Sequence, residues 1–350
     1  MNINRRQFIT TLGVTTLATH LATQIPPVIA KKSLSANIII KPPCLQIGDT
    51  VGLISPAGIV EAKDIEDAKQ TFISLGLQVK TGLHILDRDG YLAGKDADRA
   101  QDINTMFADK SVKAIIAMRG GWGCNRILPL LNYPLIRSHP KIIMGYSDIT
   151  SLLLAINARS RLITFHGAVA TSTWNQFTVD YFKRILFNAE TVIMENNQNS
   201  AGKIEVIAPG KARGKIVGGN LSVIAAMVGS AYLPSWRKSI LFLEDIGEDI
   251  YRIDRMLTQL KNAGILQQIT GFIFAQCTNC QLGDEPSFTL MQILKQHIQP
   301  LSIPAWYGSM IGHIQDKFTV PMGVEVEIDA ENGTIKMLES AVISCSVKDL

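Results

Sequence analysis

The stretch Ile142-Ile143-Met144-Gly145-Tyr146-Ser147-Asp148-Ile149-Thr150 decides the fold class of this 350-residue chain. Its first three residues form a short apolar run typical of a buried strand, and residues 148–159 have the apolar spacing of a helix. Gly145 and Tyr146 mark the turn between the two. Buried strands that alternate with helices indicate a parallel sheet covered on both faces.

The same alternation continues toward the N-terminus. The pattern predicts strands at 51–54 and 112–118, and helices at 59–75 and 96–107. Right-handed crossovers bring the carboxyl ends of parallel strands to one edge of the sheet, where functional loops are expected. We therefore predict an α/β fold, with a Rossmann- or flavodoxin-like N-terminal domain at residues 45–170.

Toward the C-terminus the pattern weakens and then resumes. Residues 171–203 include the polar run Asn196-Asn197-Gln198-Asn199-Ser200 and are interpreted as a linker. Residues 204–342 are predicted to form a second, smaller, β-rich α/β domain. Its expected strands lie near 214–217, 240–243, 271–275 and 324–328, and its expected helices near 220–228 and 251–263.

The composition is that of a globular protein with a nearly neutral charge. Hydrophobic residues make up 47% of the chain and charged residues 18%, which excludes a disordered protein or a polyelectrolyte. The chain has 34 basic and 30 acidic residues. This balance gives no basic footprint for nucleic acid, so no nucleic-acid partner is expected.

Residues 1–30 are typical of a cleaved targeting segment. Asn4-Arg5-Arg6-Gln7-Phe8-Ile9 resembles a twin-arginine signal, and a mildly apolar stretch follows at 12–25. That stretch is too short and too polar for a comfortable membrane span. We expect cleavage after Ala30, export to the periplasm or otherwise out of the cytoplasm, and no stable membrane insertion afterwards. An ordinary tail or an uncleaved anchor is the alternative, and the protein would be cytoplasmic if the signal is not functional.

Among the five cysteines, one pair has the spacing of a metal or redox site, Cys277-Thr278-Asn279-Cys280. No second pair or histidine follows at the distance that zinc needs, and the pair trails an apolar run into a loop. We interpret it as two incidental loop thiols or one local disulfide. No metal and no cofactor is predicted.

Ser147 is a candidate nucleophile because it lies where a strand gives way to a helix. Such a turn lifts the side chain out of the sheet, and the backbone N–H of Asp148 can donate to an oxyanion. Ile149 stands where the strict G-x-S-x-G motif has its last glycine. A Ser-Asp pair that opens a helix is more often a simple N-cap, so the motif alone leaves two interpretations open.

The run Arg119-Gly120-Gly121-Trp122-Gly123 follows a predicted strand. Its glycines let the backbone come close to a ligand, but the run has neither the dinucleotide nor the Walker spacing. It is either a tight turn or, if it lies near Ser147, the source of a second oxyanion donor.

Glu244, Asp245 and Glu248 follow the apolar run 240–243. A carboxylate at the end of a strand can orient a histidine in a triad, although a capping cluster before the next helix is equally consistent with the pattern. Because side chains alternate along a strand, Glu244 and Asp245 are expected to face opposite ways.

Two of the six histidines, His166 and His313, stand beside a glycine after apolar residues. A lone histidine in such a place is more often structural. Ser147, Glu244 and His313 nevertheless form a hydrolase constellation in chain order, which only geometry can establish.

Taken together, the motifs resemble the LD-carboxypeptidase family, the muramoyl-tetrapeptide carboxypeptidases. In the N-terminal half the resemblance is carried by Tyr91-Leu92-Ala93-Gly94 with Arg99, by residues 114–123 and by residues 145–150. In the C-terminal half it is carried by Gly218-Gly219-Asn220-Leu221, Leu243-Glu244-Asp245 with residues 251–255, and Gly312-His313 with Pro321-Met322-Gly323. The match runs in order from about residue 45 to about residue 340.

The resemblance implies a serine peptidase with Ser147 as nucleophile and with Glu244 and His313 as the other triad members. The implied oxyanion donors are the backbone of Asp148 and the Gly120-Gly121 loop. The family further implies a homodimer without metal that removes the terminal D-alanine from peptidoglycan tetrapeptides.

One departure from the family concerns the compartment. Typical members act in the cytoplasm on recycled fragments, so the predicted export leaves open whether the substrate is recycled muropeptide or the intact wall. Two other functions remain as alternatives. One is an immunity-type amidase that hydrolyses a peptide–nucleotide antibiotic, and the other is a muropeptide-binding protein that has lost catalysis.

Overall fold

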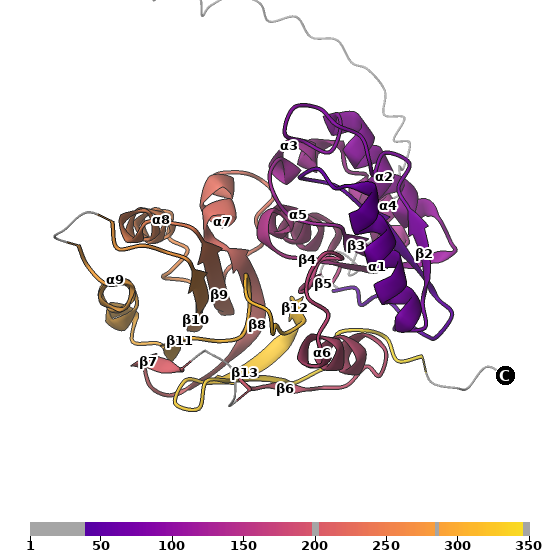
Figure 1. The fold of residues 1–350 in the computed structure, drawn as a ribbon. Helices are drawn as coiled ribbons and strands as arrows, with labels where there is room; N and C mark the ends of the chain where they lie inside the picture. Colours follow the sequence, from indigo (N-terminus) through magenta and orange to yellow (C-terminus); the bar gives the residue numbers. More distant parts are fainter. Residues whose placement is uncertain (1–38, 198–202, 284–286, 346–350) are drawn as a thin grey trace, which may run out of the picture. The chain divides into compact units, whose positions relative to one another are not determined.

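Two sheets organise the structure (Figure 1). The computed structural model describes residues 39–197, 203–283 and 287–345, all within one compact unit. The signal predicted for residues 1–30 lies outside the described residues. In the part of the chain that is described, no helix combines the length and the apolar character needed to cross a bilayer.

The first sheet has six strands in the order β12-β5-β4-β3-β1-β2. They are β1 (Thr50–Ile54), β2 (Gln78–Thr81), β3 (Val112–Ala117), β4 (Ile142–Gly145), β5 (Thr164–His166) and β12 (Val320–Met322). All neighbours are parallel except β12, which is antiparallel to β5. Nearly all residues of β1, β3 and β4 are buried, so both faces of the sheet are covered, as the sequence predicts.

The helices of this half are α1 (Ala62–Ser74), α2 (Asp96–Ala108), α3 (Cys124–Ile127), α4 (Tyr133–Ser138) and α5 (Thr150–Ser160). Two 3₁₀ turns, η2 (Leu128–Leu130) and η3 (Ser147–Ile149), accompany them. In α1 the buried residues Ile65, Ala68 and Phe72 recur at spacings of three and four, which places them on one face of the helix. The predicted helices and strands of this half are therefore confirmed within a few residues.

The second sheet has eight strands in the order β6-β14-β13-β8-β9-β10-β11-β7. They are β6 (Ile193–Met194), β7 (Glu205–Ala208), β8 (Lys211–Asn220), β9 (Ser239–Ile246), β10 (Gly271–Thr278), β11 (Ala305–Tyr307), β13 (Glu325–Asp329) and β14 (Thr334–Met337). Strands β8 to β11 are parallel and the others are antiparallel to their neighbours. The helical elements of this half are α7 (Leu221–Met227), α8 (Ile250–Asn262), α9 (Leu290–Ile298) and η4 (Gln299–Leu301).

The stretch 171–203, which the sequence indicates to be a linker, contains helix α6 (Gln176–Leu186) as well as β6. The ring of Trp174 packs edge-on against Phe72 of α1 and Phe182 of α6, with centroids 5.1 Å apart in each case. Strand β6 extends the second sheet at β14. This stretch is thus more than an extended connection, because apolar contacts that its weak pattern does not reveal fix it to both halves.

The C-terminal part of the chain also contributes a strand and a disulfide to the N-terminal half. Strand β12 comes from the C-terminal part of the chain but pairs with β5 of the first sheet. Cys345, near the end of the described chain, forms a disulfide with Cys44. The boundaries predicted at 45–170 and 204–342 remain a prediction, since the structure joins these blocks by shared strands.

The carboxyl ends of the parallel strands in the two sheets meet. Strand β8 ends at Asn220, whose backbone N–H donates to Thr150 Oγ1 at 3.1 Å, where the elbow after β4 leads into α5. Ligand sites of open α/β sheets lie beyond the carboxyl ends of the strands. The fold therefore brings loops from both sheets to one place.

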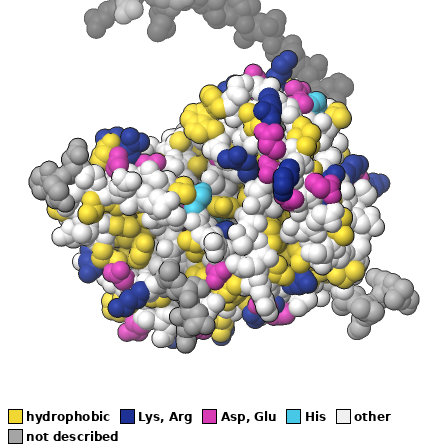
Figure 2. Space-filling model, viewed as in Figure 1, with side chains coloured by type: hydrophobic (Ala, Val, Ile, Leu, Met, Phe, Trp, Pro, Cys, Tyr) yellow, Lys and Arg dark blue, Asp and Glu magenta, His cyan; other side chains and the backbone are white. Residues whose placement is uncertain are grey.

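On the face of the molecule that Figure 2 shows, basic and acidic side chains are interspersed rather than gathered by sign.

Candidate active site

Ser147 begins η3 directly after β4, and its backbone is in the left-handed region with φ of +63°. Few residues other than glycine adopt this conformation, which commonly marks functional turns. The sharp turn between strand and helix is the geometry that raises a nucleophile above the edge of a sheet. The structure thus supports an elbow at this position although the last glycine of the strict motif is missing.

The glycine loop after β3 lies against Ser147. A Cβ atom added to Gly120 would be 2.7 Å from Ser147 Cβ, 2.9 Å from Ser147 Oγ and 3.4 Å from the backbone nitrogen of Asp148. Real Cβ atoms essentially never approach so closely, so only glycine fits. The guanidinium of buried Arg99 donates to the carbonyl of Gly123 at 3.2 Å and fixes the far end of the loop.

The side chain of Asp148 has a structural partner. Its buried carboxylate accepts a hydrogen bond from the backbone N–H of Cys124 at 2.8 Å, and burial raises its pKa. The carboxylate therefore ties the elbow to the start of α3. The backbone N–H of Asp148, near the start of η3 and beside Gly120, is then the group of this residue that could donate to an oxyanion.

His313 and Glu244 form a close pair. His313 Nδ1 lies 2.7 Å from Glu244 Oε2, and the Glu244 side chain is fully buried while that of His313 is 13% exposed. Gly312 has a φ of +106°, and a Cβ there would overlap Glu244 Oε2. The glycine before His313 is thus required both by the backbone and by the carboxylate.

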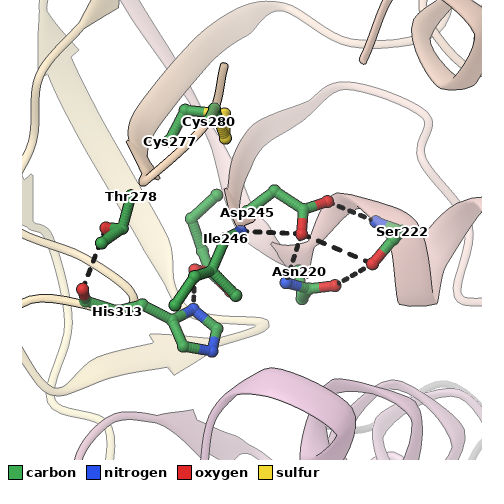
Figure 3. Close-up of a disulfide and its surroundings, with 9 residues drawn as sticks. Asn220, Ser222, Asp245, Ile246, Cys277, Thr278, Cys280 and His313 are labelled. Atoms are coloured by element: carbon green, nitrogen blue, oxygen red, sulfur yellow. Dashed lines mark hydrogen bonds and ion pairs between the residues drawn. A yellow bond between two sulfur atoms is a disulfide. The ribbon is translucent and has the colours of Figure 1, made fainter. Parts of the chain in front are cut away.

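Asp245 faces the other way, as the alternation along β9 predicts. Its carboxylate accepts hydrogen bonds from Ser222 N at 2.8 Å and Asn220 Nδ2 at 3.1 Å, and in Figure 3 it is turned toward these residues rather than toward the His313 ring. Burial and the charge of Glu244 raise the pKa of Asp245 to about 6. Asp245 therefore holds the first turn of α7 instead of the histidine.

The third acid of the cluster, Glu248, lies before α8. Its carboxylate is 3.9 Å from the guanidinium of Arg252, four residues later in the chain. A partly exposed pair at this spacing is weak. Of the three acids that the sequence could not separate, only Glu244 contacts His313 in the described residues.

The His313 ring packs edge-on against the ring of Tyr146, with centroids 4.8 Å apart. Lys317 Nζ lies 5.0 Å from the centre of the same Tyr146 ring, and burial lowers the pKa of Lys317 to about 8. Because Tyr146 precedes Ser147, these contacts bring the histidine of the second half to the elbow of the first. No local pattern in the sequence marks Tyr146 or Lys317 for such a role.

The carboxyl end of β10 contacts the backbone of His313. Thr278 Oγ1 donates to the backbone carbonyl of His313 at 2.9 Å, and Cys277 and Cys280 on either side of it form a disulfide (Figure 3). Of the two interpretations of this pair, incidental thiols or a local disulfide, the structure has the disulfide. It closes the short loop that presents Thr278.

A cleft of about 560 Å³ opens beside Ser147. Its walls come from the glycine loop and α3, from the elbow, and from the ends of β8 and β9. They include Trp122, Asn125, Arg126, Asp148, Asn220, Ser222, Asp245 and Glu248. Of these, Trp122 is 64% exposed, and its ring meets that of Tyr91 edge-on at 5.7 Å.

Within the described residues, one group of side chains offers three metal-type donors close together, His84, Asp87 and Asp98. These atoms lie within 4.8 Å of one another near the edge strand β2. His84 Nδ1 and Asp87 Oδ2 are already hydrogen-bonded at 2.8 Å. The group shares no residue with the cleft beside Ser147.

Comparison with known proteins matches the sequence of this chain to one family. The model of the LD-carboxypeptidase N-terminal domain matches residues 51–167, and that of the C-terminal domain matches residues 213–328. The chain is 37% identical to the probable murein peptide carboxypeptidase of Bacillus subtilis over 314 residues, which cover 88% of this chain and 97% of the relative. The chain belongs to the LD-carboxypeptidase family.

Two solved structures are similar to this chain over most of its length. Muramoyltetrapeptide carboxypeptidase from Oxalobacter formigenes superposes with a TM-score of 0.73 at 27% identity and covers 82% of this chain and 97% of its own. The microcin C7 self-immunity protein MccF, known from Escherichia coli, superposes in its apo state with a TM-score of 0.80 at 25% identity. That match covers 87% of this chain and 100% of MccF. This member of the LD-carboxypeptidase family thus has relatives named as carboxypeptidases and a relative named as a microcin C7 self-immunity protein.

Proposed function

We propose that this LD-carboxypeptidase family member is a serine carboxypeptidase that removes the terminal D-alanine from peptidoglycan tetrapeptides. The observation that carries the proposal is the buried Glu244–His313 pair at 2.7 Å, packed on Tyr146 beside an elbow serine. A carboxylate that accepts the Nδ1–H of a histidine fixes the tautomer whose Nε2 can take a proton from serine. The names of the carboxypeptidase relatives support the substrate class.

In the proposed reaction His313 Nε2 removes the proton from Ser147 Oγ, and Oγ attacks the carbonyl carbon that precedes D-alanine. The negative charge on the carbonyl oxygen is held by the backbone N–H of Asp148 and by the Gly120-Gly121 loop. His313 then protonates the amine of D-alanine as the C–N bond breaks. Water, deprotonated by His313, hydrolyses the ester and restores Ser147.

The direct test is to incubate the purified chain with a defined tetrapeptide and measure free D-alanine. The wild-type chain should release it, and Ser147→Ala should not while its fold remains intact. Ser147→Ala is a clean control because the elbow depends on backbone geometry and the change removes only the hydroxyl. Release at the wild-type rate by Ser147→Ala would remove this serine from the mechanism.

The likeness to MccF favours a second candidate, a serine amidase of the immunity type. One MccF structure holds glutamyl sulfamoyl guanosine, which combines an amino acid with a nucleoside. The same triad serves either amide. The two functions are separated by comparing kcat/KM for a tetrapeptide and for an aminoacyl sulfamoyl nucleoside on the same preparation, and we expect the tetrapeptide to be preferred.

We also propose that the enzyme acts outside the cytoplasm. Disulfides persist in oxidising compartments, and the described residues form two, Cys44–Cys345 and Cys277–Cys280. They agree with the export signal predicted from Arg5 and Arg6. Replacing both arginines with lysine should leave full-length protein in the cytoplasm, whereas unchanged processing after Ala30 would defeat the twin-arginine route.

A further inference from the structure

His166 stands at the end of β5, next to the elbow that carries Ser147. Its neighbour in the sheet is Gly145 of β4, and the N–H of Gly167 donates to the Gly145 carbonyl at 3.1 Å. The side chain of His166 is 1% exposed, and its ring packs edge-on against Phe242 with centroids 5.2 Å apart. The proposed mechanism makes no use of this second buried histidine.

The ring faces the triad carboxylate from the side opposite His313. His166 Nε2 lies 3.9 Å from Glu244 Oε1, while Glu244 Oε2 is the oxygen that His313 contacts. Among the described residues, Nε2 of His166 and Oε1 of Glu244 are both buried and both without a hydrogen-bond partner. A separation of 3.9 Å is longer than a hydrogen bond, but a movement of about 1 Å would make one.

His166 Nε2 and Glu244 Oε1 are well placed to form a hydrogen bond with each other, because both are buried and lack a partner. A buried polar atom left without a partner is costly, and most such atoms in proteins are satisfied. The groups around His166 that carry charge or titrate are Glu244, His313, Lys317 and Tyr146, whose ring centre lies 6.2 Å from that of His166. Among these described groups, Glu244 is the one that places an acceptor oxygen without a partner near Nε2, at 3.9 Å.

A neutral His166 can carry on Nε2 the proton that this bond needs. Burial lowers the pKa of His166 to about 4, so the ring is neutral near pH 7 and carries one N–H. A bare Nε2 would face the carboxylate lone pairs and be repelled. The tautomer with the proton on Nε2 is therefore the one that fits beside Glu244.

We propose that His166 is a positioning residue that donates its Nε2–H to Glu244 Oε1 and thereby fixes the oxygen that orients His313. The inference rests on the proposed function, because it assigns His166 a role through the triad. Its consequence is that the acid of the second sheet is oriented by the first sheet, from the strand beside the nucleophile. Correct docking of the two sheets then assembles the triad.

Three variants of His166 test the proposal. His166→Phe keeps the ring shape but has no donor, and His166→Gln places an amide N–H near the position of Nε2. His166→Asn carries the same amide but on a shorter side chain that does not reach Glu244. We expect His166→Phe and His166→Asn to lose roughly 10- to 100-fold in kcat with little change in KM, and His166→Gln to stay within about 3-fold of wild type.

A spectroscopic readout separates positioning from a merely structural role. The His313 Nδ1 proton that is shared with Glu244 should give a far-downfield ¹H NMR signal in the full chain, also in the Ser147→Ala background. We expect this signal to move or broaden in His166→Phe and His166→Asn and to be retained in His166→Gln. If His166→Phe does not fold, the Asn and Gln pair gives the same contrast.

Wild-type kcat and an unchanged downfield signal in His166→Asn or in a folded His166→Phe would overturn the proposal, and so would an equal loss in His166→Gln. Failure of the proposed function has a different signature. In that case the wild-type chain releases no D-alanine from the tetrapeptide. The downfield signal, which needs no substrate, would still report whether His166 holds Glu244.

Discussion

His313 Nδ1 lies 2.7 Å from Glu244 Oε2, although 69 residues separate the two in the chain. The carboxylate comes from β9 and is fully buried, and the histidine follows β11 in a loop that Gly312 shapes. Both lie at the carboxyl edge of the second sheet, where they meet the Ser147 elbow of the first through the Tyr146 ring. The site thus depends on the contact between the two sheets.

The first prediction concerns the acid that serves the histidine. Glu244→Gln should lower kcat by about 10⁴-fold, because an amide can present the wrong partner to Nδ1 and cannot stabilise the imidazolium. Glu248→Gln is the comparison variant, because Glu248 lines the cleft and pairs weakly with Arg252 at 3.9 Å but does not contact His313, so its kcat should stay close to that of the wild type. Steady-state measurement of kcat on the tetrapeptide for the two variants tests which acid serves His313. If Glu248→Gln is the dead variant and Glu244→Gln is active, the middle member of the triad is wrong.

The second prediction concerns the glycine before the histidine. Gly312→Ala should reduce kcat by about 100-fold or more, because the added Cβ overlaps Glu244 Oε2 and displaces the carboxylate. Gly264→Ala also places a side chain at a positive φ, +72°, but its Cβ meets no atom within 4 Å. Activity measured at matched folded fraction should therefore fall only in Gly312→Ala. Equal activity of the two variants would show that the carboxylate is not held as described.

The third prediction concerns the loop closed by Cys277–Cys280. Thr278→Val removes the hydroxyl that holds the His313 carbonyl, a hydrogen bond of about 1 kcal/mol, and should lower kcat about 5-fold. Thr278→Ser keeps the donor and should stay close to wild type. Both rates can be measured on the oxidised protein with the tetrapeptide. A loss in Thr278→Ser as large as in Thr278→Val would assign the effect to packing.

The fourth prediction concerns stability at acid pH. The pKa of His166 is about 4 in the folded chain and about 6.5 when unfolded. Above pH 6.5 the ring is neutral in both states. Between pH 6.5 and 4 the unfolded chain binds a proton that the folded chain refuses, so the free energy of unfolding falls with falling pH, by roughly 1 kcal/mol per unit. Denaturant unfolding measures the free energy of unfolding at pH 6.5 and at pH 4.5. The decrease between these two pH values should be about 2 kcal/mol smaller in His166→Gln than in the wild type. Equal decreases in the two proteins would contradict a neutral buried ring.

Local patterns in the sequence were enough to predict three strands of the first sheet, β1, β3 and β4, and a strand-to-helix turn at Ser147. The apolar run before Gly145 and the helical spacing after Ser147 identify a strand and a helix without any distant contact, and β4 and α5 lie there. The alternation along β9 likewise predicts that Glu244 and Asp245 face opposite ways. These features depend on neighbours in sequence, which is why they could be read from it.

Distant contacts could not be read in this way. His166 and His313 look alike in sequence, each beside a glycine, and only the meeting of the two sheets distinguishes their positions around Glu244. Lys317 is an ordinary lysine in sequence and becomes a buried cation on Tyr146 only in the fold. The Cys44–Cys345 disulfide joins residues 301 positions apart, and no spacing rule connects them.

The most direct test of the account is to identify the atom that becomes acylated. The wild-type chain is mixed with an activated ester of the peptide acyl group, and the intact mass and the modified peptide are determined within one turnover. We expect a mass increase equal to one acyl group, located on Ser147, and no such adduct in Ser147→Ala or, on the same time scale, in His313→Ala. An adduct on another residue, or D-alanine release by Ser147→Ala at the wild-type rate, would contradict it.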